Sequence, residues 1–189
     1  MLRPLLARAI LPLALGIATP ALAFENPLDR GPLADFLSVF RQQAVPRQVI
    51  AWKSGHAPGT IVISTGQRRL YYVLGPGQAI QYGVGVGRQG FSWTGVKTVT
   101  MKREWPDWRP PSQMLQRRPD LPRYMAGGVE NPLGARALYL GSSLYRIHGS
   151  NEPETIGQAV SSGCFRLLND DVIDLYSRVK VGAKVIVMR

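Results

Sequence analysis

Cysteine and histidine are almost missing from this chain of 189 residues, which contains only Cys164, His56 and His148. A single cysteine excludes an internal disulfide, and so few soft ligands without clustered spacing argue against a zinc site. We therefore expect no metal and no other cofactor. Cys164 is then either an inert thiol in the core or a reactive one, and its neighbours in the sequence must decide between these readings.

Acidic residues are also scarce, with 12 Asp and Glu against 23 Lys and Arg, which gives a formal net charge of +11. A basic chain suits an anionic polymer or lipid headgroups of the cell envelope, unless the charge is simply solvated surface. The basic residues are scattered rather than blocked. Together with the export signal described next, this argues against nucleic acid as a partner.

Long apolar runs are lacking except at the N-terminus. There, Arg3 and Arg8 accompany an apolar stretch over residues 9–18, and Ala21-Leu22-Ala23 fits the small-x-small rule of signal peptidase. The stretch is too short for a stable transmembrane span. We predict a cleaved signal peptide over residues 1–23 and an exported, periplasmic protein, with an uncleaved N-terminal anchor as the alternative.

Residues 24–57 are predicted to form an N-terminal leader ahead of one domain over residues 58–189. Within the leader, apolar residues of Pro32–Gln43 recur at helical spacing. We expect a short helix there, either packed on the outside of the domain or mobile.

Short strands dominate the rest of the chain. Runs of β-branched and aromatic residues, or alternating apolar and polar residues, predict strands at 61–63, 70–74, 80–86, 96–101, 137–140, 144–147 and 183–188. One clear helix is expected from Asn169 or Asp170, as its cap, to Val179, and one or two helical turns within 154–160. The pattern predicts a mainly β fold with a mixed sheet and a few short helices.

Residues 102–134 interrupt this strand pattern with tryptophans and many prolines and glycines. A loop of this length is uncommon in a compact domain and is usually functional or disordered, and the tryptophans argue against disorder. We expect a structured excursion that either borders a cleft or caps the sheet.

Cys164 has neighbours that suit nucleophilic catalysis. Gly163 frees the backbone to turn sharply, so that adjacent N–H groups can point at one spot, as an oxyanion hole requires. His148, at the end of a predicted strand, can serve as a base and lower the pKa of the thiol. Arg166 can bind a substrate carboxylate or help to hold a thiolate. Taken singly, His148 and Arg166 also fit structural roles, and His56 reads as a loop residue.

The segment that holds these residues resembles the signature of the L,D-transpeptidase family, which has a YkuD-type catalytic domain. The usual form is His-Gly-Thr, a gap, and Ser-x-Gly-Cys-Ile-Arg-Met-x-Asn-x-Asp. This chain has His148-Gly149-Ser150 and then Ser161-Ser162-Gly163-Cys164-Phe165-Arg166-Leu167-Leu168-Asn169-Asp170-Asp171. Ser150 keeps the hydroxyl of threonine, Phe165 is larger than isoleucine, and Ser162 stands where many members have histidine. The resemblance covers most of residues 58–189.

The resemblance implies a mixed-sheet, β-sandwich-like fold in which Cys164 is the nucleophile and His148 the base. The implied substrate is the tetrapeptide stem of peptidoglycan, attacked at the L-centre carbonyl of stem position three with release of D-alanine. An amine of a neighbouring stem would then resolve the thioester into a 3→3 cross-link. Main-chain N–H groups near Gly163 and Cys164 would hold the oxyanion, and the Ser161 and Ser162 backbone would orient His148, with Gly149 as further support.

Other readings share part of this pattern. With water as acceptor the same chemistry gives an L,D-carboxypeptidase, and with a lysine of an envelope protein it gives anchoring of that protein to the wall. Hydrolases of the NlpC/P60 type place the cysteine before the histidine, and caspases separate the two more widely, so both fit less well. The non-enzymatic alternative is a basic wall-binding protein with an inert thiol.

Overall fold

A computed structural model of the chain describes residues 45–189. The predicted signal peptide over 1–23 and the predicted helix over Pro32–Gln43 lie outside the described residues. No helix among residues 45–189 is long and apolar enough to cross a membrane.

Most regular structure in the described part of the chain is strand, which confirms the mainly β prediction. The strands are β1 (Gln48–Ala51), β2 (Ile61–Ser64), β3 (Arg69–Gly75), β4 (Gln78–Gly83), β5 (Val86–Gly87), β6 (Gly95–Glu104), β7 (Arg136–Leu140), β8 (Arg146–His148), β9 (Ala159–Ser161), β10 (Phe165–Arg166) and β11 (Lys184–Met188). The helices are α2 (Ser112–Arg117), α3 (Asn169–Arg178) and the 3₁₀ turn η2 (Pro153–Thr155).

The main sheet has nine strands in the order β1-β4-β3-β2-β11-β6-β7-β8-β10, and β5 and β9 form a separate pair. It is mixed, as predicted, because β2–β11 and β8–β10 are parallel while the other pairs are antiparallel. Strand β6 joins the two halves of the sheet: its first residues pair with β11 and its later ones with β7, with a register shift between Val99 and Met101. Such an irregularity bends a strand.

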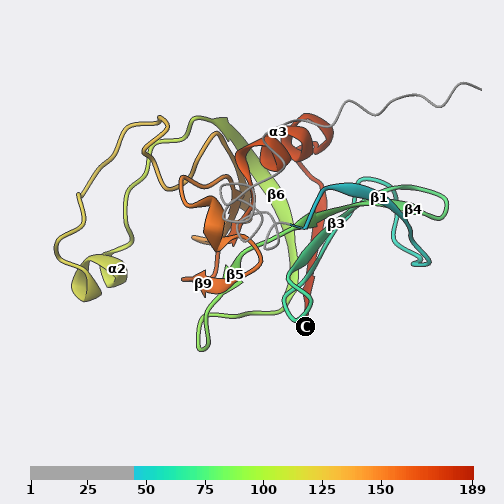
Figure 1. The fold of residues 1–189 in the computed structure, drawn as a ribbon, viewed down its shortest axis with the longest axis horizontal. Helices are drawn as coiled ribbons and strands as arrows, with labels where there is room; N and C mark the ends of the chain where they lie inside the picture. The colour runs from blue at the N-terminus through green and yellow to red at the C-terminus, as the bar shows by residue number, and fades with distance from the viewer. Residues whose placement is uncertain (1–44) are drawn as a thin grey trace, which may run out of the picture.

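One hydrophobic core joins the two halves of the sheet. Its buried side chains include Ile61 and Tyr82 from the β2 side and Leu138 and Phe165 from the β10 side. Because both halves bury their apolar faces in the same cluster, the sheet curls around its core, with α3 packed against it (Figure 1).

Helix α3 begins at Asn169 as expected, but not through the predicted cap. No side-chain hydrogen bond caps it, and the Asn169 Oδ1 atom instead accepts the N–H of Ala135 at 2.9 Å. At the other end, the Lys102 ammonium donates to the carbonyls of Tyr176 and Val179 at 2.6 and 2.7 Å. The prediction of a capping Asn169 is therefore wrong, because a long-range contact takes its side chain.

Other segments also differ from the sequence prediction. The single strand expected over 80–86 is divided, because β4 ends at Gly83 and β5 pairs with β9 in the separate sheet. The expected helical turns within 154–160 are reduced to η2, and the chain then extends into β9. Strand β1 lies in the predicted leader and pairs along its whole length with β4, at the edge of the sheet. The end of that leader is therefore part of the sheet.

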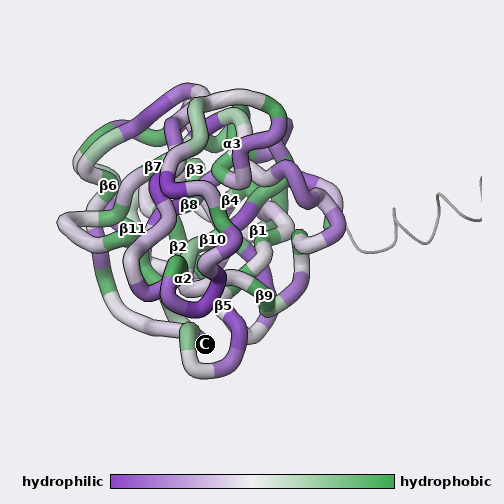
Figure 2. The backbone as a smooth tube through the Cα atoms, turned by 90° about the vertical axis from the view of Figure 1, so that its left-hand side faces the viewer, coloured by the Kyte–Doolittle hydropathy of each residue, from purple (hydrophilic) through white to green (hydrophobic). Residues whose placement is uncertain are grey.

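The excursion between β6 and β7 is structured, as the tryptophans indicated. It carries α2 at its far end (Figure 1), and an isolated bridge between Trp108 and Met125 joins its two arms. The side chain of Asn131 closes its base, donating to the Ala126 carbonyl and accepting the Leu133 N–H, each at 2.9 Å. In Figure 2, which is turned so that this side faces the viewer, α2 lies in front of the short strands β8 and β10.

Candidate active site

A cavity of about 670 Å³ lies between the excursion and the short strands β8, β9 and β10. The excursion contributes Met114 and Arg117 of α2 to its wall, and the Asn151 amide ties the two sides together by donating to the Glu130 carbonyl at 3.0 Å. Five of the sequence-predicted site residues line this cavity: His148, Ser161, Ser162, Cys164 and Arg166. The excursion therefore borders the candidate site, which is one of the two roles expected for it.

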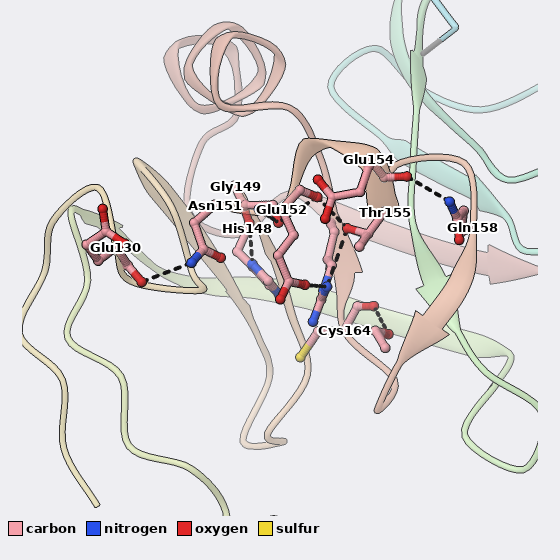
Figure 3. A network of polar contacts seen from close by, with 12 residues as sticks. Glu130, His148, Gly149, Asn151, Glu152, Glu154, Thr155, Gln158 and Cys164 are labelled. Atoms are coloured by element: carbon pink, nitrogen blue, oxygen red, sulfur yellow. Dashed lines mark hydrogen bonds and ion pairs between the residues drawn. The ribbon is translucent and has the colours of Figure 1, made fainter. Parts of the chain in front are cut away.

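The pairing of β8 with β10 brings the predicted histidine and cysteine together. These strands are parallel, with His148 opposite Arg166, and the Leu167 N–H donates to the His148 carbonyl at 2.8 Å. Cys164 immediately precedes β10, so its thiol lies near the end of β8 (Figure 3). His56, in contrast, lies on an exposed loop and is not among the cavity residues.

His148 is buried and held in one tautomer. Its Nδ1 atom lies 2.6 Å from the carbonyl oxygen of Gly149. A carbonyl oxygen can only accept, so Nδ1 carries the proton and Nε2 keeps a free lone pair. Burial, reinforced by the charge of Arg166, lowers the pKa of His148 to about 3. The imidazole is neutral at physiological pH, as a general base must be, and its orienting carbonyl belongs to Gly149 rather than to the expected Ser161 and Ser162 backbone.

The Cys164 thiol is also neutral at rest. Its sulfur lies 3.6 Å from the Leu144 carbonyl, and burial raises the pKa of the thiol although Arg146 and Arg166 oppose this shift. The expectation that the imidazole lowers the thiol pKa is therefore wrong for this state, because desolvation outweighs the neighbouring positive charges. The pair is a thiol and an imidazole, not a preformed ion pair.

The turn before Cys164 is braced by one hydroxyl. Ser161 Oγ donates to the Cys164 carbonyl at 2.6 Å and accepts the Gly163 N–H at 3.1 Å. Gly163 has a φ of 108°, and a Cβ there would lie 2.5 Å from the ring of Tyr145. The predicted glycine is thus required by both backbone and space. Its N–H, however, already has a partner, which removes it from the expected oxyanion hole.

Gly149 is confined as tightly as Gly163. A Cβ at this position would collide with the Asn169 side-chain oxygen and lie 3.0 Å from the Ala135 nitrogen. Glycine therefore lets the chain pass close to Asn169 while its own carbonyl orients His148. The Gly149 N–H donates to the Arg136 carbonyl at 3.0 Å, so the contact of this residue with the imidazole is made by its carbonyl.

Arg166 is engaged within the chain. Its Nη1 atom donates to Glu152 Oε2 at 2.6 Å and to Thr155 Oγ1 at 3.3 Å, which ties β10 to η2. Glu152 therefore neutralises the guanidinium that was expected to bind a substrate carboxylate. The Nε of Arg166 is buried without a hydrogen-bond partner.

Sequence reasoning missed Tyr145 and Arg146, which both line the cavity. Tyr145 stacks on Trp93, whose Nε1 donates to the Gly163 carbonyl at 2.9 Å. Arg146 stands two residues before His148 on a strand, and side chains at this spacing point to the same face. That periodicity was a usable signal for Arg146.

Within residues 45–189, no group of three or more His, Cys, Asp or Glu side chains is placed to hold a metal ion. The side chains that line the cavity include a thiol, an imidazole, guanidinium groups, carboxylates and hydroxyls.

Comparison with known proteins agrees with this geometry. A family model described as the L,D-transpeptidase catalytic domain, YkuD, matches residues 58–187. Among curated proteins, the probable L,D-transpeptidase ErfK/SrfK of Escherichia coli K12 is 36% identical over 85% of this chain and 54% of its own length. The probable L,D-transpeptidase YbiS of the same strain is 36% identical over 75% of this chain and 47% of its own length. The chain thus spans about half the length of these relatives.

Solved structures support the fold. An L,D-transpeptidase from Mycobacterium smegmatis gives a TM-score of 0.57 at 18% identity, over 75% of this chain and 67% of its own. A Brucella melitensis structure described as a probable carnitine operon oxidoreductase is 43% identical, over 76% of this chain and 94% of its own, with a TM-score of 0.52. That description differs from the family model and from the curated relatives, which agree with one another.

Proposed function

Because the chain belongs to the L,D-transpeptidase family with a YkuD catalytic domain, we propose that it is an exported, periplasmic cysteine L,D-transpeptidase acting on peptidoglycan tetrapeptide stems. One observation carries the proposal: Cys164 and a neutral His148 with a free Nε2 line the same cavity. The signature residues of the family stand at these positions. The cavity is also large enough for a peptide, since ligand sites in proteins occupy about 300–1,000 Å³.

The first half-reaction begins with a neutral pair. As the sulfur of Cys164 attacks the L-centre carbonyl of stem position three, its proton passes to Nε2 of His148. A neutral thiol and a neutral imidazole favour this coupling, because charge develops only when the substrate has displaced water. The Gly149 carbonyl stabilises the imidazolium through Nδ1.

The tetrahedral oxyanion then needs a donor close to the sulfur. The Gly163 N–H is bonded to Ser161, so we assign this role to the main-chain N–H of Cys164 itself. Ser161 fixes the orientation of that peptide by bonding the Cys164 carbonyl. The imidazolium gives its proton to the departing nitrogen, and the C–N bond breaks. D-alanine is released, and the rest of the stem remains bound to Cys164 as a thioester.

The second half-reaction depends on which nucleophile enters. A side-chain amine of a neighbouring stem attacks the thioester, His148 accepts its proton, and the thiol is released with a 3→3 cross-link. Water in the same place gives an L,D-carboxypeptidase, and a lysine of an envelope protein gives wall anchoring. The excursion wall of the cavity lies opposite β8 and β10 and is the part of the site we assign to the acceptor.

Purified disaccharide-tetrapeptide, incubated with the chain lacking residues 1–23, tests this function by mass spectrometry of the products. We expect loss of D-alanine and a cross-linked dimer, both abolished in Cys164→Ala. Loss of D-alanine without a dimer identifies the carboxypeptidase or a missing acceptor. No reaction by a folded protein that still binds the wall contradicts the enzymatic proposal and favours the wall-binding alternative.

A further inference from the structure

Arg146 shares the neighbourhood of the thiol. Its Nη1 atom donates to the Leu144 carbonyl at 3.3 Å, and the Cys164 sulfur lies 3.6 Å from that same oxygen. The guanidinium and the thiol therefore meet at one carbonyl on the wall of the cavity. The main chain and side chain of Arg146 also interact with Cys164 and oppose the rise of its pKa.

The charge of Arg146 is not matched by a carboxylate within residues 45–189, whereas Arg166 is paired with Glu152 at 2.6 Å. The Nε atom of Arg146 is buried without a hydrogen-bond partner. Its guanidinium carbon lies 5.0 Å from the centroid of the Tyr139 ring, across the β7–β8 pair. Stacking on the Tyr139 ring holds the Arg146 guanidinium in place and leaves its N–H groups available as donors.

We propose that Arg146 binds the C-terminal carboxylate of the donor stem, and so selects stems that end one residue after the bond that Cys164 attacks. This inference rests on the proposed function, and it assigns to Arg146 the carboxylate-binding role that was expected of Arg166. A guanidinium that no carboxylate neutralises can bind an incoming carboxylate through two parallel hydrogen bonds.

Covalent geometry identifies which carboxylate lies within reach. In a terminal residue, the carboxylate carbon is three bonds from the attacked carbonyl carbon, or under about 4 Å. A carboxylate on the side chain of stem position three is six bonds away. A guanidinium beside the thiol therefore meets the terminal carboxylate, and a longer stem would push an uncharged peptide group against Arg146.

The peptide test compares disaccharide-tetrapeptide with its C-terminal amide. The wild-type chain should lose about tenfold to a hundredfold in kcat/KM on the amide, the effect of a lost charged hydrogen bond. Arg146→Gln should lose a similar factor on the acid and become indifferent to amidation. Arg103→Gln, the same change on an exposed part of β6, should keep the wild-type preference. A preference that survives in Arg146→Gln overturns the proposal.

A third peptide separates the two carboxylates. A stem with lysine at position three lacks the side-chain carboxylate but keeps the terminal one. We expect Arg146→Gln to change the rate on this stem by the same factor as on the natural stem. If the effect of the substitution disappears on the lysine stem, Arg146 serves the other carboxylate and the proposal is wrong.

An alkylation test does not depend on transpeptidation. Iodoacetate and iodoacetamide each form an S–C bond with Cys164 and release iodide, and they differ mainly in the carboxylate that iodoacetate carries. Intact mass gives the rate of alkylation by each reagent. The rate with iodoacetate divided by the rate with iodoacetamide should be about tenfold lower in Arg146→Gln than in the wild type. Arg146→Lys, which keeps the charge but not the fork, should lie between them. An unchanged ratio in a variant with a wild-type melting profile overturns the proposal even if the peptides react. A changed ratio with unreactive peptides supports the guanidinium site and contradicts the proposed function alone.

Discussion

The ring of Tyr145 packs against Gly163, in the space that any side chain at that position would fill. Tyr145 is itself fixed by stacking on Trp93 at 4.7 Å between ring centroids. The turn that presents Cys164 is therefore held from outside by two aromatic rings and from inside by the hydroxyl of Ser161. The site is a preformed turn rather than a flexible loop that happens to carry a thiol.

Gly163→Ala should lower the free energy of unfolding by about 2–4 kcal/mol. The cost of a positive φ for alanine and the cost of the clash between its Cβ and the Tyr145 ring both contribute. Gly182→Ala is a matched control, with a φ of 94° and nothing within 4 Å of the added Cβ. It should cost only about 1–2 kcal/mol, and leave the rate of Cys164 alkylation unchanged. Urea unfolding measures both; equal losses in the two variants would refute the packing argument.

Ser161→Ala removes the acceptor of the Gly163 N–H and the donor to the Cys164 carbonyl. Ser161 is 3% exposed, so we expect a loss of about 1–3 kcal/mol in stability and a lower rate of D-alanine release. Ser177→Ala, at an exposed hydroxyl that bonds the Asp174 carbonyl, should change stability by less than about 0.5 kcal/mol. If D-alanine release is unaffected in Ser161→Ala, the hydroxyl does not position the turn for catalysis.

His148 should make stability depend on pH. Its pKa of about 3 in the folded chain lies below its ordinary value of about 6.5, so only the unfolded chain binds this proton between those values. The free energy of unfolding should therefore fall as pH drops through this window, by at most about 5 kcal/mol from this group. His148→Gln should reduce the slope relative to wild type.

His56→Gln, on an exposed loop, is the control for that measurement and should retain the wild-type slope. Comparing variants cancels the carboxylates that titrate in the same range. Parallel curves for wild type and His148→Gln between pH 4 and pH 6 would contradict a buried neutral imidazole.

Arg166 and Glu152 should be coupled. They form a partly exposed pair at 2.6 Å, so a double-mutant cycle with Arg166→Ala and Glu152→Ala should give about 0.5–1 kcal/mol in urea unfolding. Arg166→Ala should also slow D-alanine release by loosening β10 and η2, and Glu152→Ala should slow it in the same direction. If Arg166→Ala strongly slows D-alanine release and Glu152→Ala does not, Arg166 binds the substrate directly and the positioning role is wrong.

Much of this molecule could be predicted from local patterns. The strands follow from the alternation of apolar and polar residues at neighbouring positions. The proposed nucleophile and base follow from a motif in which the two residues are only 16 positions apart. The structure departs where a residue has two possible partners: Asn169 bonds Ala135 rather than capping α3, and the Gly163 N–H bonds Ser161 rather than facing the oxyanion.

The missed features depend on strands that are distant in the sequence. Burial raises the pKa of the Cys164 thiol, and the sulfur lies against the carbonyl of Leu144, which is 20 residues earlier in the sequence. The pairing of Arg166 with Glu152 likewise depends on the turn before η2, and it leaves Arg146 as the unpaired one of the two arginines that act on the thiol. Spacing alone does not rank two arginines that both approach the same thiol.

The most direct test of the account is to trap the thioester. The chain lacking residues 1–23 is mixed with disaccharide-tetrapeptide, quenched in acid at short times, and examined by intact mass and peptide mapping. We predict a transient mass increase equal to the stem without D-alanine, located on Cys164 and absent from Cys164→Ala. Release of D-alanine that persists in Cys164→Ala, or an adduct on another residue, would contradict the central claim.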